Sequence, residues 1–266
     1  MKKEVMQLWE KTPGMCEEIP QLTAYIPDEK KSDAAIVILP GGGYSMRAGY
    51  EGEGYAVFLA EHGYTAFVCD YRVSPHRFPL PLLDARRAVR TVRHMSDKYG
   101  IDKNKIAIMG SSAGGHLAAL ASTYYEPIDF EGADDTDKED FVPNAQILCY
   151  PVINLIGKPG EVHFGSGQNL LYEDHGTRGW ELSPNNIVSE KTPPAFIWHT
   201  FEDGSVNIKN SLDYANALRD FNINSECHFY PDGPHGMGLA AGDDKVRRHV
   251  AGWADRLLEW LSYIGF

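Results

Sequence analysis

Short apolar runs alternate with longer amphipathic stretches along most of the chain, and this alternation is the feature that most constrains the fold. The first runs are apolar at nearly every position, which indicates strands buried on both faces, as in a parallel sheet. β-Branched and aromatic residues predict strands at Ala35–Leu39, Thr65–Asp70, Lys105–Met109, Ala145–Tyr150, Ala195–His199 and Ser225–Tyr230. Amphipathic periodicity predicts helices at Glu53–His62, Leu82–Tyr99, Gly114–Tyr124, Ile208–Phe221 and Lys245–Ile264.

This order predicts an α/β fold with a mostly parallel, doubly wound sheet and helices on both faces. An additional strand at Gln21–Ile26 is expected to form an antiparallel edge. No internal repeat or low-complexity linker interrupts the chain, so residues 1–266 are expected to form a single domain.

Charge and hydropathy exclude several classes of partner. The formal net charge of −12 repels phosphate backbones, so a nucleic-acid partner is not expected. No run approaches the roughly 18 apolar residues that span a bilayer, and the N-terminal stretch lacks the apolar core of a signal peptide. The 4 cysteines form no CxxC pair, and Cys69 and Cys149 lie inside apolar runs, where buried free thiols are expected. We therefore expect a cytoplasmic protein in a reducing compartment, while its oligomeric state stays open.

Two segments depart from the strand and helix pattern. Residues 126–144 hold 8 acidic residues against 1 lysine, which favours a solvated loop, and the run lacks the spacing of a calcium-binding EF-hand. Residues 154–192 are rich in Gly, Pro and His and only weakly periodic. A loop of that length is usually functional or disordered, and we expect it to form a partial lid.

The pentapeptide Gly110–Gly114 has the form G-x-S-x-G, with Ser112 at its centre. The pattern alone is weak, but it follows a predicted strand and leads directly into a predicted helix. That strand–turn–helix context is typical of a nucleophile elbow, in which a strained serine points out above the sheet. An ordinary glycine-rich turn is the plain alternative. Ser111 falls outside the symmetric glycine spacing and is not expected to be the nucleophile.

The segment Leu39–Tyr44 (LPGGGY) follows the first strongly apolar strand. Its glycines would let backbone N–H groups approach an oxyanion without interference from side chains. We expect Gly42 and Gly43 to donate two such N–H groups and Ala113, directly after the nucleophile, to donate another. Neither of the glycine-rich patterns of phosphate-binding loops is present, although a flexible turn remains the alternative.

The base and the orienting acid are expected on loops after the last two strands. His235 lies in such a loop, rich in Pro and Gly, whereas His228 lies on a predicted strand, and His94 and His249 lie on predicted helices. His116, four residues after the nucleophile, is expected to serve packing or hydrogen bonding. Asp203, which a glycine follows, is preferred to Glu202 as the acid. The chain order Ser–Asp–His is the one expected for an α/β-hydrolase.

Taken in order, PGGGY, DYRV, FPLPLLDARRAVR, IAIMGSSAGGHLAA, TPPAFIWHTFEDGSV and GPHGMGL resemble the bacterial carboxylesterases related to hormone-sensitive lipase. The resemblance is to the branch of acetyl and xylan esterases, sometimes called sugar hydrolases, in which Pro40 replaces the histidine of the common HGGG motif. It implies the α/β-hydrolase fold. The triad mechanism requires no cofactor, and no HExxH or paired-cysteine pattern indicates a metal. The resemblance also implies framework roles for Glu51, Arg72 and Asp84, with Ser183–Pro184 closing the variable segment over the pocket.

The sequence therefore predicts a serine carboxylesterase for short-chain, acetyl-type esters, with an acetylated sugar as the expected substrate. Tyr44, Trp180 and His199 are expected to contact that substrate, with Tyr172 available beside Trp180 to stack on a sugar ring. Two other activities stay open on the same triad, namely those of a peptidase and an arylformamidase. A binding protein that has lost catalysis is a further alternative, but such proteins usually lack the serine or the histidine.

Overall fold

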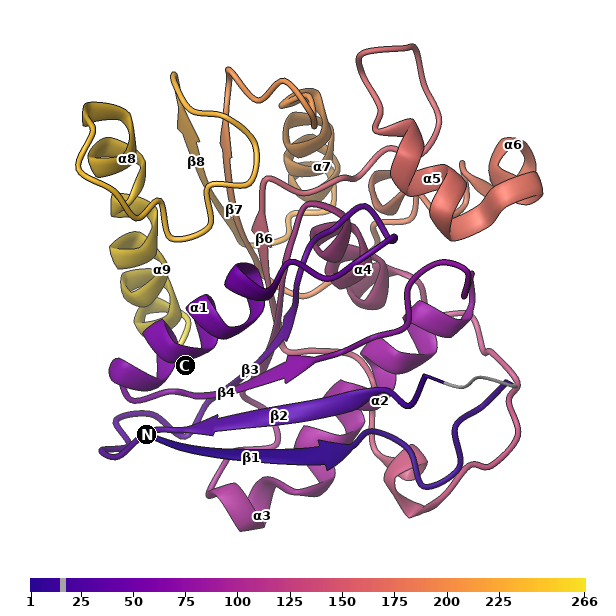
Figure 1. The fold of residues 1–266 in the computed structure, drawn as a ribbon, viewed down its shortest axis with the longest axis vertical. Helices are drawn as coiled ribbons and strands as arrows, with labels where there is room; N and C mark the ends of the chain where they lie inside the picture. Colours follow the sequence, from indigo (N-terminus) through magenta and orange to yellow (C-terminus); the bar gives the residue numbers. More distant parts are fainter. Residues whose placement is uncertain (15–17) are drawn as a thin grey trace.

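The computed structural model describes residues 1–14 and 18–266, and within these ranges the chain forms an eight-stranded sheet with helices on both faces (Figure 1). Cys16 lies outside the described residues; Cys69 and Cys149 are free and buried, as predicted. The strands are β1 (Lys2–Gln7), β2 (Gln21–Ile26), β3 (Ala35–Leu39), β4 (Thr65–Cys69), β5 (Ile106–Ser111), β6 (Ala145–Cys149), β7 (Ala195–Thr200) and β8 (Ser225–Tyr230). The helices are α1 (Gly49–Glu61), α2 (Leu80–His94), α3 (Ser96–Tyr99), α4 (Ser112–Thr123), α5 (Phe164–Leu171), α6 (His175–Arg178), α7 (Lys209–Asp220), α8 (Lys245–Val250) and α9 (Gly252–Tyr263).

The strands lie in the order β1-β2-β4-β3-β5-β6-β7-β8. Strands β3 to β8 are parallel, and β2 pairs antiparallel with both β1 and β4. The predicted doubly wound sheet is therefore confirmed, but β2 is not its edge. That position belongs to β1, which the sequence did not reveal because it is polar and Val5 on it is 61% exposed.

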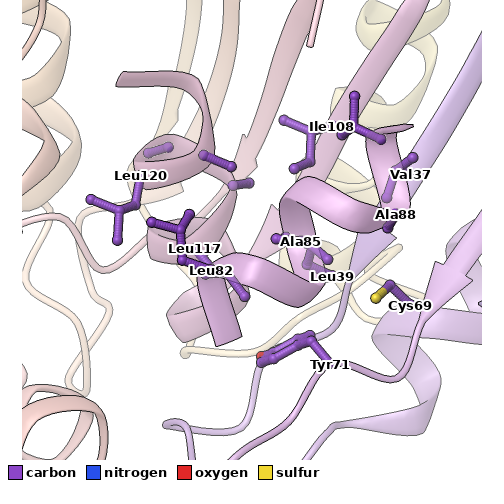
Figure 2. Packing of buried hydrophobic residues seen from close by; sticks show 14 of the residues in the cluster. Val37, Leu39, Cys69, Tyr71, Leu82, Ala85, Ala88, Ile108, Leu117 and Leu120 are labelled. Carbon is purple, nitrogen blue, oxygen red and sulfur yellow. The ribbon is translucent and has the colours of Figure 1, made fainter. Parts of the chain in front are cut away.

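Two apolar layers cover the two faces of the sheet. Helices α1 and α9 bury side chains against one face, and α2, α4 and α7 bury theirs against the other. Figure 2 shows the second layer, in which Leu82 of α2 and Leu117 of α4 lie close to each other under Ile108 of β5. Since β3 to β7 are buried at every residue, the carboxyl ends of the parallel strands are held in fixed positions.

Several helix boundaries differ from those predicted. The stretch expected as one helix over Leu82–Tyr99 is α2 and α3, separated at Met95, and the last predicted helix is α8 and α9, separated at Ala251. Gly252 begins α9, and glycine is a poor former of helix interiors, which accounts for the second break. The helix after the glycine-rich elbow begins at Ser112, two residues earlier than predicted.

A buried ion pair joins the loop after β4 to α2. The Arg72 guanidinium donates from Nε to Asp84 Oδ2 and from Nη2 to Asp84 Oδ1, both at 2.8 Å, and both side chains are fully buried. The Trp9 indole N–H donates to the same carboxylate at 2.8 Å. Every charge is thus satisfied inside the protein, as the framework role implied by the resemblance requires.

The sequence predicted that the acidic segment 126–144 is a solvated loop, but the segment packs against α2. Arg87 of α2 donates to Asp134 at 2.5 Å and to Asp137 at 2.6 Å, and the Asp137 side chain is only 8% exposed. Arg90 also reaches Asp137, at 3.4 Å. Charge-assisted hydrogen bonds to α2 therefore hold this segment against the helix, and the two carboxylates are already paired.

Residues 154–192 contain α5, α6 and two short 3-10 turns at Tyr172–Asp174 and Pro184–Asn186. The prediction of a weakly periodic loop was wrong because these helices are too short for a periodic pattern to show. Ser183 is buried, accepts from the Leu155 N–H at 2.9 Å and donates to Gly179 O at 2.6 Å. It therefore stabilises the segment from within, and its closing of the segment over a pocket stays a prediction.

Candidate active site

Ser112 lies at the junction of β5 and α4, at the carboxyl edge of the sheet. Its φ of 53° places it in the left-handed region, where a side chain is strained. A Cβ at Gly110 would overlap the backbone of Gly114, and a Cβ at Gly114 would overlap the carbonyl of Leu39. The strained turn expected from the pentapeptide is therefore present, and it has room only for glycine two residues before and two residues after the serine.

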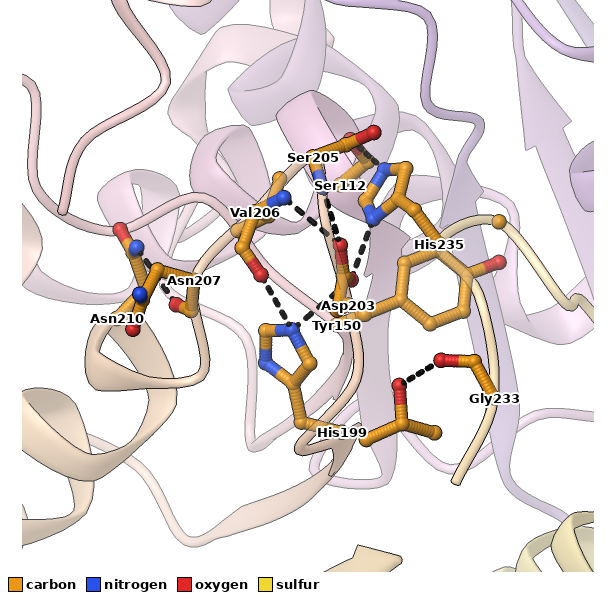
Figure 3. A network of polar contacts seen from close by, with 12 residues as sticks. Ser112, Tyr150, His199, Asp203, Ser205, Val206, Asn207, Asn210, Gly233 and His235 are labelled. Carbon is orange, nitrogen blue, oxygen red and sulfur yellow. Dashed lines mark hydrogen bonds and ion pairs between the residues drawn. The ribbon is translucent and has the colours of Figure 1, made fainter. Parts of the chain in front are cut away.

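Ser112, His235 and Asp203 come together above this edge, although they are far apart in sequence (Figure 3). His235 Nε2 lies 2.9 Å from Ser112 Oγ, and His235 Nδ1 lies 2.6 Å from Asp203 Oδ2. Since a carboxylate can only accept, Nδ1 carries the proton, and Nε2 of the neutral ring accepts from the serine hydroxyl. A base is thus in contact with a nucleophile and is oriented by an acid. Glu202, the alternative acid, is exposed and lies 3.3 Å from the Gly233 N–H.

Asp203 accepts four hydrogen bonds. Its Oδ1 accepts from the backbone N–H groups of Ser205 at 2.9 Å and Val206 at 2.8 Å. Its Oδ2 accepts from His199 Nε2 at 3.1 Å as well as from His235. Burial acts to raise the pKa of Asp203, but the hydrogen bonds from His199 and His235 outweigh it, and the pKa falls well below 3.8. The carboxylate therefore remains charged beside the imidazole.

His199 is fully buried on β7, so the prediction that it contacts the substrate was wrong. Its Nε2 lies 3.0 Å from Val206 O, an obligate acceptor, so this nitrogen carries the proton and donates to Asp203 as well. Its Nδ1 accepts from Ser211 Oγ at 2.8 Å. His199 therefore supports the acid.

The glycine loop presents free backbone donors. Gly42 and Gly43 have φ values of 132° and 63°, which favour glycine, and their N–H groups meet no acceptor among the described residues. The Gly41 N–H is occupied, because it donates to Glu51 Oε2 at 2.7 Å. Ala113 is the second residue of α4, where backbone N–H groups lack an intrahelical partner. The donors expected for an oxyanion are thus free at this end of the sheet.

Glu51, expected only as a framework residue, lies beside this site. Its Oε1 accepts from Tyr150 OH at 2.6 Å, and Tyr150 OH accepts from the Gly238 N–H at 3.0 Å. The Tyr150 ring lies edge-on against the His235 imidazole, with centroids 5.1 Å apart. Burial raises the pKa of Glu51, and the hydrogen bonds from Tyr150 and Gly41 offset only part of the rise. Glu51 thereby joins the glycine loop to the loop that carries the histidine.

A cavity of about 230 Å³ opens above Ser112. It is small, and most of its lining residues are glycines or residues that carry a polar group. Its lining residues are Gly42, Gly43, Ala48, Tyr50, Glu51, Ser112, His163, Ser205, His235 and Gly236. Sequence reasoning missed His163 and Ser205, because their approach to the serine depends on tertiary contacts and not on a motif.

Two further predicted substrate contacts do not lie in this cavity. Tyr44 is fully buried, and its hydroxyl lies 2.7 Å from His116 Nδ1. His116 Nε2 donates to Leu182 O at 2.8 Å, so Nδ1 must accept from Tyr44; burial lowers the pKa of His116 to about 4. Trp180 is 61% exposed but is absent from the cavity lining. The prediction of substrate contact at Tyr44 was therefore wrong, and Trp180 lies outside the pocket of Ser112.

Within residues 1–14 and 18–266, no cluster of three or more His, Cys, Asp or Glu side chains has a geometry that could hold a metal ion. In the same ranges, every helix is too short or too polar to cross a bilayer.

Comparison with known proteins gives consistent matches. A family model described as BD-FAE matches residues 22–218. The solved acetyl ester-xyloside bifunctional hydrolase from Caldicellulosiruptor lactoaceticus superposes with a TM-score of 0.90 at 41% identity, over 99% of this chain and 97% of that one. The α/β-hydrolase MGS-M1 from a deep-sea metagenome library gives a TM-score of 0.75 at 29% identity, over 99% and 98% of the two chains.

An acetylxylan esterase from Xylanibacter ruminicola is 33% identical over 244 residues, which are 88% of this chain and 47% of that protein. Across three curated relatives, the chain spans 35%, 47% and 55% of the relative's length. These matches therefore cover most of this chain but only part of those proteins.

Proposed function

The chain belongs to the BD-FAE family, and from that premise we propose that it is a serine carboxylesterase that hydrolyses short-chain esters, in particular acetyl esters of carbohydrates. The matches confirm the α/β-hydrolase fold and the expected likeness to bacterial acetyl and xylan esterases. The observation that carries the proposal is His235, whose Nε2 lies 2.9 Å from Ser112 Oγ and whose Nδ1 lies 2.6 Å from Asp203.

In the proposed reaction, His235 takes the proton of Ser112 while Oγ attacks the ester carbonyl. The N–H groups of Gly42, Gly43 and Ala113 stabilise the oxyanion of the tetrahedral intermediate. The intermediate collapses, and the alcohol leaves with the proton from His235, which gives an acyl-serine. A water molecule, deprotonated by His235, then releases the acid and restores Ser112. Asp203 keeps the imidazole oriented and stabilises its charged form.

The size and polarity of the cavity support a short acyl group. A volume of about 230 Å³ accommodates an acetyl group together with part of an alcohol, but not a long acyl chain as well. A long chain also requires an apolar groove, whereas this cavity is lined by glycines and by polar side chains such as His163 and Ser205. A relative of known structure is described as acting on an acetyl ester and a xyloside, which supports carbohydrate as the alcohol half.

We further propose that residues 154–192 cover one side of the cavity as a partial lid, within a single domain. His163 from this segment lines the cavity, and Asn169 Nδ2 of α5 donates to Gly43 O at 2.8 Å. Arg77 also donates to Gln168 O of α5, at 3.0 Å. A lid in this position would exclude water and limit the length of the acyl group.

The proposal is tested with p-nitrophenyl esters from acetate to palmitate, followed by acetate release from acetylated xylo-oligosaccharides. We expect kcat/KM to be highest for acetate or propionate and to fall beyond butyrate. Each additional methylene that fits gains only about 0.8 kcal/mol of binding free energy, and methylenes beyond that length clash with the cavity wall. A maximum at octanoate or longer would contradict the short-chain assignment. Equal or greater activity on peptide amides or N-formyl aryl amides would instead indicate a peptidase or an arylformamidase.

A further inference from the structure

Two polar side chains in the cavity are used by neither the triad nor the oxyanion donors. His163 comes from the segment before α5, and Ser205 from the loop after β7. They line the same cavity as Ser112 and His235. Figure 3 shows Ser205 beside these two residues. Their free atoms are available to a ligand.

Local contacts fix the hydrogen-bonding state of His163. Its Nδ1 accepts from the Ser166 backbone N–H at 3.2 Å and lies 2.9 Å from Ser166 Oγ. Because an N–H can only donate, the proton of the neutral ring must be on Nε2. Burial lowers the pKa of His163 and the nearby His235 lowers it further, against an opposing effect of Asp203, and the lowered pKa favours the neutral ring. His163 therefore presents one N–H donor, at Nε2, which has no acceptor among the described residues.

The His163 ring lies close to the glycine loop. A Cβ built on Gly43 would lie 3.9 Å from His163 Cε1, the ring atom bonded to Nε2. Ser205 is anchored on the other side by its backbone N–H, which donates to Asp203 Oδ1 at 2.9 Å. Its hydroxyl meets no partner in the described part of the chain and can both donate and accept. The two groups thus come from different loops that converge on one cavity.

The chemistry of the ester decides which half they serve. An acetyl methyl group has nothing to hydrogen-bond, and the carbonyl oxygen is the group that the backbone donors address. Only the alcohol half can use an additional N–H and a hydroxyl. We propose that His163 Nε2 and Ser205 Oγ form a subsite for hydroxyl groups on the alcohol half, adjacent to the scissile ester. The enzyme thereby selects acetylated polyols over acetates of simple alcohols. This inference rests on the proposed esterase function.

The test uses two acetates with a six-membered ring, mono-O-acetylated methyl β-xylopyranoside and cyclohexyl acetate. The first carries hydroxyls beside the ester, and the second carries none. His163→Phe and Ser205→Ala should each lower kcat/KM for the xyloside about 10-fold, since each removes one hydrogen bond, and change it less than about 2-fold for cyclohexyl acetate. His163→Gln, which retains an N–H donor near the Nε2 position, should recover part of the loss for the xyloside alone.

His62→Phe is the matched control, because His62 is an exposed histidine that does not line the cavity. It should leave both substrates unchanged, and thermal melts establish that every variant folds. If a variant loses activity on both esters equally, or on neither, the subsite is refuted while the esterase function stands. If the parent enzyme cleaves neither acetate nor any p-nitrophenyl ester, the proposed function itself fails and the subsite fails with it.

Discussion

Asp203 and Glu51 are two buried carboxylates near the same imidazole, but their ionisation differs. Burial raises the pKa of both, yet the pKa of Asp203 ends well below its ordinary value and that of Glu51 ends above it. Asp203 accepts two backbone N–H groups and two imidazole N–H groups, whereas Glu51 accepts one backbone N–H and phenolic hydroxyls. The larger and stronger donor set of Asp203 therefore outweighs the effect of burial on its pKa, whereas the donors to Glu51 do not.

The same difference separates their proposed roles. Asp203 contacts His235 directly, at 2.6 Å, and acts on its charge and orientation. Glu51 contacts Gly41 of the glycine loop and Tyr150, whose hydroxyl accepts from Gly238 beyond the histidine. We infer that Glu51 is a positioning residue, which fixes the position of the glycine loop, with its oxyanion donors, relative to the loop that carries His235. Substitutions of Asp203, of Glu51 and of His199, which donates to Asp203, can separate the two roles.

The largest expected effects are at Ser112 and Asp203. Asp203→Asn should lower kcat about 10⁴-fold, because an amide favours the wrong tautomer of His235. Ser112→Ala should lower kcat by about 10⁴- to 10⁶-fold and defines the floor of the measurement. Steady-state kinetics on p-nitrophenyl acetate gives both values, and circular dichroism checks the fold. Harmless Ser112→Ala combined with inactive Ser111→Ala would overturn the assignment of the nucleophile.

Glu51→Gln should cost less, about 10- to 100-fold in kcat. A glutamine side chain cannot accept from both Gly41 N–H and Tyr150 OH, so the glycine loop loses part of its support, and removal of one oxyanion donor is worth about 10²- to 10³-fold. Tyr150→Phe breaks the same connection from its other end and should give a loss of similar size. If Glu51→Gln were as damaging as Asp203→Asn, the distinction between a charge role and a positioning role would collapse.

His199→Phe should have a smaller effect on rate, about 5- to 10-fold, since one hydrogen bond to Asp203 is lost. Without this donor, Asp203 carries more negative charge toward His235 and favours the imidazolium. The acid limb of the pH–rate profile should therefore move to higher pH, whereas Glu51→Gln, which removes a nearby negative charge, should move it to lower pH. Profiles of kcat/KM between pH 5 and 9 test the two directions; shifts of equal sign would contradict the comparison.

The smallest expected effects are on the pH dependence of stability. The lowered pKa of Asp203 means that its ionised form stabilises the fold above pH 3.8, and this contribution is lost as the pH falls through the folded-state pKa. The raised pKa of Glu51 means the opposite: the parent loses stability as the pH rises above 4.5. Relative to the parent, the Tm of Asp203→Asn should rise as the pH falls below 3.8, while that of Glu51→Gln should rise as the pH increases above 4.5. Thermal melts across these pH ranges measure both trends.

The features that the sequence predicted are those set by local pattern. Strands β3 and β7 are continuous apolar runs, and Ser112, Asp203 and His235 each lie directly after a predicted strand, so their meeting follows from a parallel sheet. Strand β1 was missed because an exposed edge strand carries no apolar alternation. Glu51 and Tyr150 are 99 residues apart, and nothing in either local sequence indicates their contact. His163 likewise becomes part of the cavity only because α5 docks on the glycine loop.

Gly110 and Gly114, two residues before and after Ser112, limit which substitutions the family can accept at this turn. Cβ atoms at Gly110 or Gly114 would overlap the backbone of the elbow or of β3, whatever residue occupies position 112. A descendant that no longer catalyses anything would still be selected against replacing them, because the fold itself needs the close approach. It would be free to lose Ser112 or His235, whose side chains support no comparable contact. The glycines of the motif therefore indicate only that a chain has this fold. The three polar side chains indicate whether it has kept the catalytic activity.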